Sequence, residues 1–189
     1  MKVIIIEGPD NCGKNTIIHN LIDNNDSVKV IHCHKPDKTA DDPLKEMSGI
    51  FFHHANIIIK DYQLDNTDVV VFNRYYFGEW VYGQLYRHEN PDEIKAMIQS
   101  VEHYLLAAID HNDIYYLQLL SSSASLLKNN DDGESLSNAD IHKIDREISL
   151  FEEVYGFSVL KKKMVYVNDG DRYRNQQDIL NEVNLFIQA

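Results

Sequence analysis

The residues best suited to chemistry lie near the N-terminus, where two glycines and a lysine follow an apolar run. They fit the pattern G-x-x-x-x-G-K at Gly8, Gly13 and Lys14. The glycines permit a tight turn, so that successive backbone N–H groups point into one concavity that suits an anion. The lysine places a point charge between the outer phosphates of a nucleotide. The Ser or Thr that usually follows the lysine is replaced by Asn15.

The segments on either side supply the strand and the helix that such a loop requires. The apolar run Val3–Ile6 precedes it, and an apolar helical face follows at Ile17, Ile18, Leu21 and Ile22. An ordinary strand-to-helix turn would leave the Gly-Lys pair unexplained. The sequence therefore predicts a phosphate-binding loop.

Composition argues against several classes of function. The 189 residues, 43% of them hydrophobic, suffice for one domain with a sizeable core. The formal net charge of -12 argues against a broad nucleic-acid-binding face. Only Cys12 and Cys33 occur, which argues against a disulfide framework and for a reducing compartment. There is no signal-peptide pattern and no apolar run near the roughly 20 residues that span a bilayer. We therefore expect a cytoplasmic protein with no membrane partner.

Apolar stretches of strand length alternate with helical patterns, which is typical of βαβ units and a parallel sheet. The predicted strands are Lys2–Ile6, Val28–His32, Val69–Phe72, Ile114–Leu119 and Met164–Val167. After the helix of the loop, the predicted helices are Pro43–Asp61, Phe77–Arg87, one capped by Asn90 and running to Ile109, one capped by Ser137 or Asn138, and Gln176–Ile187. The sequence thus predicts a single three-layer α/β domain over residues 1–189, with a five-stranded parallel sheet.

Two segments together resemble the thymidylate kinase family of P-loop kinases. The first, from Ile6 to Lys14, is close to that family's E-G-x-D-x-x-G-K opening. The second ends the third predicted strand at Asn73-Arg74, where the family has an Asp-Arg-Tyr-like motif. The continuation Phe77–Arg87 is most similar to phage-encoded members, and a third similar segment lies around His53–Asn56. The resemblance implies a P-loop kinase fold that uses ATP and Mg²⁺, in the host cytoplasm if the chain is phage-encoded.

The resemblance also implies a role for each matching residue. Lys14 and Arg74 would be the catalytic residues, with the planar fork of Arg74 gripping an acceptor phosphate. Asp10 would accept a hydrogen bond from the acceptor's sugar hydroxyl. The donor's phosphates would be held by the loop residues Gly8, Asn11, Cys12, Gly13, Lys14, Asn15 and Thr16.

Further contacts implied by the resemblance each have a plain structural alternative. Lys35 stands near the family's Arg in its Arg-Glu-Pro segment, but a lysine at a strand end is often only solvated. Tyr82 falls on an aromatic position of the acceptor pocket, and Phe52 or His53 falls close to the residue that stacks on the acceptor base. Aromatic residues at helical spacing are nevertheless usually core. Residues 121–137 correspond to the kinase lid, although their polar composition also fits a solvated loop.

The chain departs from the family pattern at four places. Asn15 replaces the hydroxyl that normally binds Mg²⁺ and would be a weak ligand. Asn73 replaces an Asp, which removes a negative charge beside the expected metal. Ile57 stands where the family has an Arg. The lid segment holds no Arg, only Lys128, although phosphoryl transfer commonly uses a lid cation.

Two other groups of residues carry weaker signals. The nine histidines lack the spacing of a zinc site. Arg172 and Arg174 follow the last predicted strand, where P-loop kinases usually place the donor base, but a capped, solvated turn is the favoured interpretation.

These observations leave three functions open. The first is transfer of the ATP γ-phosphoryl group to a deoxynucleoside monophosphate, foremost a pyrimidine one. The second is a kinase for a hydroxyl acceptor, either a deoxynucleoside or a hydroxylated modified base in DNA. Ile57 favours such an acceptor, since fewer cations are needed when it carries no phosphate. The third is a non-catalytic nucleotide-binding protein, which Asn15, Asn73 and the Arg-free lid support. We expect a small nucleotide as partner; polymeric DNA is disfavoured by net charge, and a homodimer is left open.

Overall fold

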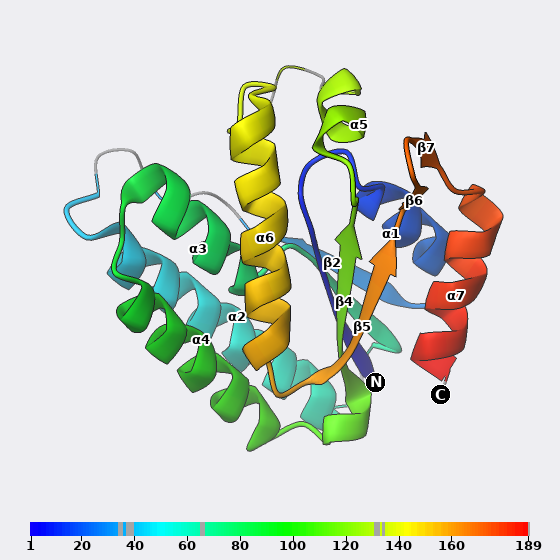
Figure 1. The fold of residues 1–189 in the computed structure, drawn as a ribbon. Coiled ribbons are helices and arrows are strands. Elements are labelled where there is room, and N and C mark those ends of the chain that lie inside the picture. Colours follow the sequence, from blue (N-terminus) through cyan, green and yellow to red (C-terminus); the bar gives the residue numbers. More distant parts are fainter. Residues whose placement is uncertain (34–35, 37–39, 65–66, 131–132, 134, 189) are drawn as a thin grey trace.

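The centre of the molecule is a five-stranded parallel sheet with helices on both faces (Figure 1). The computed structural model describes the whole chain except residues 34–35, 37–39, 65–66, 131–132, 134 and 189. The strands lie in the order β2-β3-β1-β4-β5. Their bounds are β1 (Lys2–Glu7), β2 (Val28–His32), β3 (Val69–Asn73), β4 (Ile114–Leu120) and β5 (Lys161–Tyr166). The predicted three-layer α/β fold with five parallel strands is thereby confirmed.

The central strand β1 explains why the sheet is covered on both faces. Successive side chains point to opposite faces of a strand, and all four residues from Val3 to Ile6 are buried. Val3 and Ile5 pack into one apolar cluster, whereas Ile4 and Ile6 pack into another. The first cluster includes residues of α2 (Pro43–Leu64), α4 (Pro91–Leu106) and α6 (Ile141–Phe157); the second includes residues of α1 (Lys14–Asp23) and α7 (Gln176–Gln188).

Two helix N-caps were predicted from the sequence, and the structure confirms one of them. Asn90 caps α4, accepting a hydrogen bond from the backbone N–H of Asp92 at 2.9 Å. The prediction that Ser137 or Asn138 caps α6 was wrong. Asp140 caps it by accepting from the N–H of His142, while Asn138 has a left-handed φ of 51° in the turn that precedes the helix. An N-cap needs an extended backbone, which Asp140 adopts.

The segment predicted as one helix from Phe77 to Arg87 divides into two. The helix α3 (Phe77–Tyr82) continues as a π-helical turn, η1 (Gly83–Arg87), and His88 ends it with a left-handed φ of 56°. A single π-helical turn of this kind is often found at functional sites.

Short elements complete the chain. The segment 121–137 contains the helix α5 (Ala124–Asn129), and η2 (His111–Asp113) is a 3-10 turn before β4. After β5, an antiparallel pair of short strands, β6 (Asn168–Asp169) and β7 (Arg172–Tyr173), forms where a simple turn was expected. Within the described residues, no helix is both long and apolar enough to cross a bilayer.

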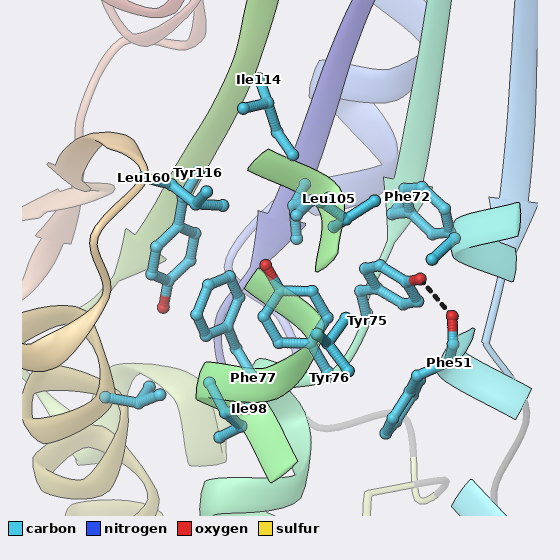
Figure 2. Packing of buried hydrophobic residues seen from close by; sticks show 14 of the residues in the cluster. Phe51, Phe72, Tyr75, Tyr76, Phe77, Ile98, Leu105, Ile114, Tyr116 and Leu160 are labelled. Atoms are coloured by element: carbon cyan, nitrogen blue, oxygen red, sulfur yellow. Dashed lines mark hydrogen bonds between the residues drawn. The ribbon is translucent and has the colours of Figure 1, made fainter. Parts of the chain in front are cut away.

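An aromatic cluster anchors the turn between β3 and α3 (Figure 2). The Phe72 and Tyr75 rings stack at 4.0 Å, and Phe77 stacks on Tyr116 at 3.9 Å. The Tyr75 hydroxyl donates to the carbonyl of Phe51 in α2 at 2.6 Å. Such ring pairs add to the gain from area burial. Core packing therefore holds the segment that follows Arg74 in place.

Candidate active site

The loop between β1 and α1 has the backbone conformation that a phosphate-binding loop needs. Gly8 has a φ of 142°, and a Cβ added there would lie 2.1 Å from the carbonyl oxygen of Leu119. Only glycine fits at this position. Asn11 and Gly13 are also left-handed, with φ values of 64° and 76°. Successive residues of this kind turn backbone N–H groups toward one point, as an anion site requires.

Lys14 lies inside the concavity of this loop rather than in solvent. Its Nζ donates to the carbonyls of Gly8 at 3.0 Å and Pro9 at 2.6 Å, and the residue is only 8% exposed. Burial, followed by the nearby charge of Arg74, lowers the pKa of Lys14 to about 8. Both of these carbonyl partners are neutral, so a bound phosphate group would give the Lys14 ammonium group a negatively charged partner.

Arg74 meets the loop from the end of β3. Its backbone is left-handed, with a φ of 67°, and its N–H donates to the Ile6 carbonyl at 3.0 Å. The guanidinium group donates to the Gly8 carbonyl at 3.1 Å, to the Tyr82 hydroxyl and to the Asp10 carboxylate. It also lies over the Tyr82 ring, with Cζ 5.1 Å from the centroid. The fold thus brings Arg74 together with other predicted site residues; Asp10, Lys14 and Arg74 are called the loop cluster below.

A buried carboxylate that sequence analysis missed fixes the position of Arg74. Glu7 is fully buried at the end of β1, and its Oε1 accepts from the N–H groups of Tyr75 at 2.7 Å and Gly78 at 3.2 Å. Burial raises the pKa of Glu7 to about 7, although Arg74 lowers it in part. The sequence signal that could have revealed the role of Glu7 is an acidic residue directly after the apolar run Val3–Ile6.

The two asparagines that depart from the family pattern contact each other. Asn73 Nδ2 donates to Asn15 Oδ1 at 2.9 Å. The Asn15 oxygen is of the type that Mg²⁺ prefers, but it is neutral and already accepts this bond. Within the described part of the chain, no group of three or more His, Cys, Asp or Glu residues is placed to hold a metal ion.

A cavity of about 1090 Å³ opens beside the loop cluster. Predicted site residues on its wall are Asp10, Asn11, Gly13, Lys14, Asn15, Arg74 and Tyr82. The described residues that sequence analysis did not place in the site but that line this cavity include Met47, Tyr75, Glu79, Tyr86 and Arg87. The segment predicted as a lid contributes Asn130 and Leu136 to the wall.

Two predicted acceptor contacts, Phe52 and His53, are not among the described residues that line this wall. Phe52 packs edge-on against Tyr104 of α4, with ring centroids 5.5 Å apart, and His53 is exposed on α2. Met47, earlier on α2, lines the cavity instead. Lys35 lies outside the described residues.

A second, smaller cavity of about 260 Å³ shares Asn11, Gly13 and Tyr173 with the wall of the first. The loop residues Asn11, Cys12, Gly13 and Thr16 line it together with Arg174 and other residues after β5. The Arg174 guanidinium is held by the Tyr166 carbonyl at 2.8 Å and by Glu182 at 3.0 Å. Of the two arginines after β5, Arg174 lines this smaller cavity and Arg172 does not.

A second set of charged residues joins α3 to the turn η1. Arg87 Nη2 donates to Glu79 Oε2, and Arg87 Nε donates to Glu89 Oε1 at 2.8 Å. Burial raises the pKa of Glu79 to about 7; Arg87 lowers it and Glu89 raises it further. We call Glu79, Arg87 and Glu89 the helix cluster. No motif in the sequence indicated this group of three residues.

No protein-family model matches this sequence, and no curated protein matches it. Solved structures do share its fold over nearly the whole chain. YorR from Bacillus subtilis, in complex with phosphorylated GDP, is 16% identical with a TM-score of 0.68, covering 99% of this chain and 96% of that one. Thymidylate kinase from Ehrlichia chaffeensis is 14% identical with a TM-score of 0.62, covering 99% and 98%. Deoxyadenosine kinase from M. mycoides, with bound dATP, is 13% identical with a TM-score of 0.53, covering 100% of both chains. The chain therefore has the three-layer fold of P-loop nucleotide kinases.

Proposed function

We propose that this protein is a phosphotransferase that moves the γ-phosphoryl group of ATP to a deoxynucleoside monophosphate, foremost a pyrimidine one. The observation that carries the proposal is the meeting of Lys14 and Arg74 at one cavity. Both cations reach the same carbonyl, that of Gly8, from different elements. A donor phosphate on one side and an acceptor phosphate on the other would then be held in line.

The donor side of the proposal rests on the loop. Its backbone N–H groups and Lys14 would hold the outer phosphates, and the smaller cavity beside Arg174 would take the donor base. The substrate would be the Mg²⁺ complex of ATP, with the metal carried by the phosphates. Asn15 Oδ1 could add one neutral oxygen to that ion if Asn73 releases it.

The acceptor side rests on Asp10, Arg74 and Tyr82. Arg74 would bind the acceptor phosphate and stabilise the moving charge, because its fork suits phosphate oxygens. Asp10 would accept from the sugar hydroxyl, and the Tyr82 ring would form part of the pocket wall. Met47 takes the place on α2 that the sequence assigned to Phe52 or His53.

The setting of the reaction is part of the same proposal. Cys12 and Cys33 are both free thiols, which suits a reducing cytoplasm. The pattern from Phe77 to Arg87 supports a relation to phage-encoded kinases, for which the compartment would be the host cytoplasm. We propose no polymeric DNA acceptor as the first choice, because the net charge is -12.

A kinase for a hydroxyl acceptor is the second candidate, and the position of Ile57 favours it. Ile57 stands on α2 where the resemblance expects an Arg, and Lys128 of the lid segment is exposed on α5. Arg87, another cation on the cavity wall, is already engaged by two carboxylates. A phosphate-free acceptor would need fewer cations than a monophosphate.

Incubation with Mg-ATP and a panel of nucleosides, nucleoside monophosphates and modified oligonucleotides, scored by product mass, tests these candidates. Phosphorylation of monophosphates alone is the expected result. If no compound is phosphorylated, the nucleotide-binding alternative replaces both.

The variant Arg74→Ala separates the two kinase candidates. With a monophosphate acceptor, affinity and turnover should fall together, since the phosphate loses both its anchor and its transition-state partner. With a hydroxyl acceptor, turnover should fall while acceptor affinity, measured directly by calorimetry, hardly changes. Intact affinity for the monophosphate in this variant would contradict our first choice.

A further inference from the structure

Tyr173 belongs to the walls of both cavities. Among the described residues, the two walls share Asn11 and Gly13 of the phosphate loop and, outside that loop, Tyr173 alone. The tyrosine is 40% exposed, and its hydroxyl donates to the backbone carbonyl of Asn11 at 3.2 Å. This bond joins two residues that are 162 positions apart in the chain. An aromatic side chain near the C-terminus thus contacts the backbone of the loop proposed to hold the donor phosphates.

The contact with Asn11 determines the direction of a neighbouring backbone donor. A peptide unit is planar, and the described residues contain no cis peptide bond, so the Asn11 carbonyl and the Cys12 N–H point in opposite directions. Fixing the carbonyl therefore fixes the Cys12 N–H, which is one of the loop groups assigned to the donor phosphates. If this peptide turned over, a carbonyl oxygen would point where the N–H now points, and it would repel a phosphate.

The local backbone holds this peptide only weakly. Asn11 lies in the turn between β1 and α1, so neither the sheet nor the helix includes it. Its left-handed φ of 64° is a conformation that non-glycine residues adopt at a cost. No other described residue donates a hydrogen bond to the Asn11 carbonyl. The orientation of the peptide therefore depends on the tyrosine.

The hairpin of β6 and β7 holds Tyr173 in place. Tyr173 pairs across the hairpin with Asn168, which is buried. The Asn168 amide is tied to the start of the lid segment: its Oδ1 accepts from the Ser122 N–H at 2.9 Å, and its Nδ2 donates to the Ser122 hydroxyl at 3.0 Å. Directly after the tyrosine, the Arg174 N–H donates to the Val167 carbonyl at 2.9 Å. Because the backbone is held on both sides, the Tyr173 hydroxyl gives the loop a fixed support.

We propose that Tyr173 is a positioning residue for the phosphate loop, whose hydroxyl holds the Asn11–Cys12 peptide with the Cys12 N–H turned toward the donor phosphates. This inference rests on the donor half of the proposed function, and it assigns no contact between Tyr173 and the nucleoside part of the donor. The affinity for a polyphosphate then depends on the fraction of molecules in which the peptide has this orientation.

The variant Tyr173→Phe tests the inference, because it removes the hydroxyl and keeps the ring on both cavity walls. Calorimetry is carried out with ATP and with inorganic tripolyphosphate, which carries neither sugar nor base. We expect both dissociation constants to rise by the same factor, about three- to tenfold, as for the loss of one hydrogen bond. The urea midpoint of unfolding should hardly change, since the hydroxyl is exposed.

The matched control is Tyr166→Phe. Tyr166 is similarly exposed, at 37%, and its hydroxyl donates to Glu152 at 2.9 Å, but it is not among the described residues that line either cavity. Both affinities should stay within about twofold of the wild type in this variant.

Three results would overturn the inference. Tripolyphosphate affinity that is equal in the wild type and Tyr173→Phe would show that the hydroxyl does not position the loop. A loss with ATP but not with tripolyphosphate would mean that the hydroxyl contacts the nucleoside instead. A wild-type protein that does not bind tripolyphosphate would contradict the donor site itself.

Product mass with Mg-ATP separates this inference from the proposed function. Weaker tripolyphosphate binding in Tyr173→Phe, without phosphoryl transfer by the wild type, supports the positioning role and contradicts the kinase. Transfer by the wild type, with unchanged tripolyphosphate binding in the variant, supports the kinase and contradicts the positioning role.

Discussion

The loop cluster and the helix cluster line the same cavity, but they are formed by different means. In the loop cluster, the backbone determines the geometry: β1 and β3 are neighbours in the sheet, and Lys14 and Arg74 follow their ends. The helix cluster depends on side chains that meet only because η1 is π-helical and His88 is left-handed. The loop cluster therefore joins Asp10 and Arg74, which are 64 positions apart in the chain, whereas the contacts of the helix cluster join residues only 2 and 8 positions apart.

The largest effect should come from the residue that joins the two clusters. Phe77 lies between Arg74 and Glu79 in the chain, is fully buried, and stacks on Tyr116. Replacing it by alanine removes the ring and leaves a cavity beneath the turn that carries both clusters. We expect Phe77→Ala to lower the free energy of unfolding by about 3–5 kcal/mol in urea titrations.

The control for Phe77→Ala is Leu185→Ala, because Leu185 is an apolar residue that is 70% exposed. Its unfolding free energy should change by no more than about 0.5 kcal/mol. A loss below about 1 kcal/mol in Phe77→Ala would show that the core does not hold this turn as the packing indicates.

The next effect concerns the loop cluster alone. In Lys14→Ala, ATP affinity or turnover should fall at least about tenfold, since a hydrogen bond to a charged group contributes roughly 1.5–3 kcal/mol. The fold should remain intact, because the lysine is buried at the cost of a lowered pKa. Calorimetry with ATP and a thermal melt measure both quantities. Unchanged ATP affinity in the folded variant would refute the assignment of the loop as the donor site.

Sequence patterns predicted the parts of the molecule that depend on local signals. The burial of all four residues Val3–Ile6 followed from their continuous apolar run, and the Asn90 cap followed from cap chemistry. The loop at Gly8 followed from its need for glycine. The five strands were predicted within a few residues of their observed bounds. The largest error was the start of β5, which was predicted at Met164 but lies at Lys161. The three lysines at this start have no apolar pattern, because β5 is an edge strand of the sheet.

The remaining parts could not be predicted because they depend on contacts that the local sequence pattern does not reveal. The helical period through Phe77–Arg87 gives no indication of the π-helical turn, after which the Glu89 N–H donates to the Gly83 carbonyl at 3.1 Å. Phe52 and Met47 both lie on α2, but Phe52 packs on Tyr104 of α4 whereas Met47 lines the cavity, and this difference arises from tertiary packing. The role of Glu7 likewise appears only in the fold, where Tyr75 in the turn after β3 and Gly78 in α3 both donate their N–H groups to it.

A pH-dependent effect should test how Glu7 supports the loop cluster. The pKa of Glu7 is raised from 4.5 to about 7 in the folded protein. Between these values the folded state binds more protons than the unfolded state, so that stability falls as pH rises and then levels off above about pH 7. The variant Glu7→Gln lacks this titration. Its stability relative to the wild type should rise by roughly 1–3 kcal/mol from pH 5 to pH 8.

The measurement for Glu7→Gln is a series of urea titrations at fixed pH values from 5 to 8. Glu79 has a similarly raised pKa of about 7, so the variant should retain part of the wild-type pH dependence. A constant stability difference between the two proteins across this range would mean that Glu7 ionises normally in the folded state.

The smallest expected effect lies at the contact between Asn15 and Asn73. Because a hydroxyl is the usual Mg²⁺ ligand at position 15, Asn15→Ser should lower the Mg²⁺ concentration that gives half-maximal turnover by a few-fold, roughly 1 kcal/mol or less. The serine also removes the acceptor of the 2.9 Å bond from Asn73 Nδ2. The control is therefore Asn73→Ala, which removes the donor side of the bond and leaves the Asn15 oxygen free for the metal. If the bond is what weakens the metal site, both variants should shift the Mg²⁺ dependence in the same direction. A clear loss of turnover in Asn15→Ser alone would instead show that the Asn15 amide acts directly on a substrate.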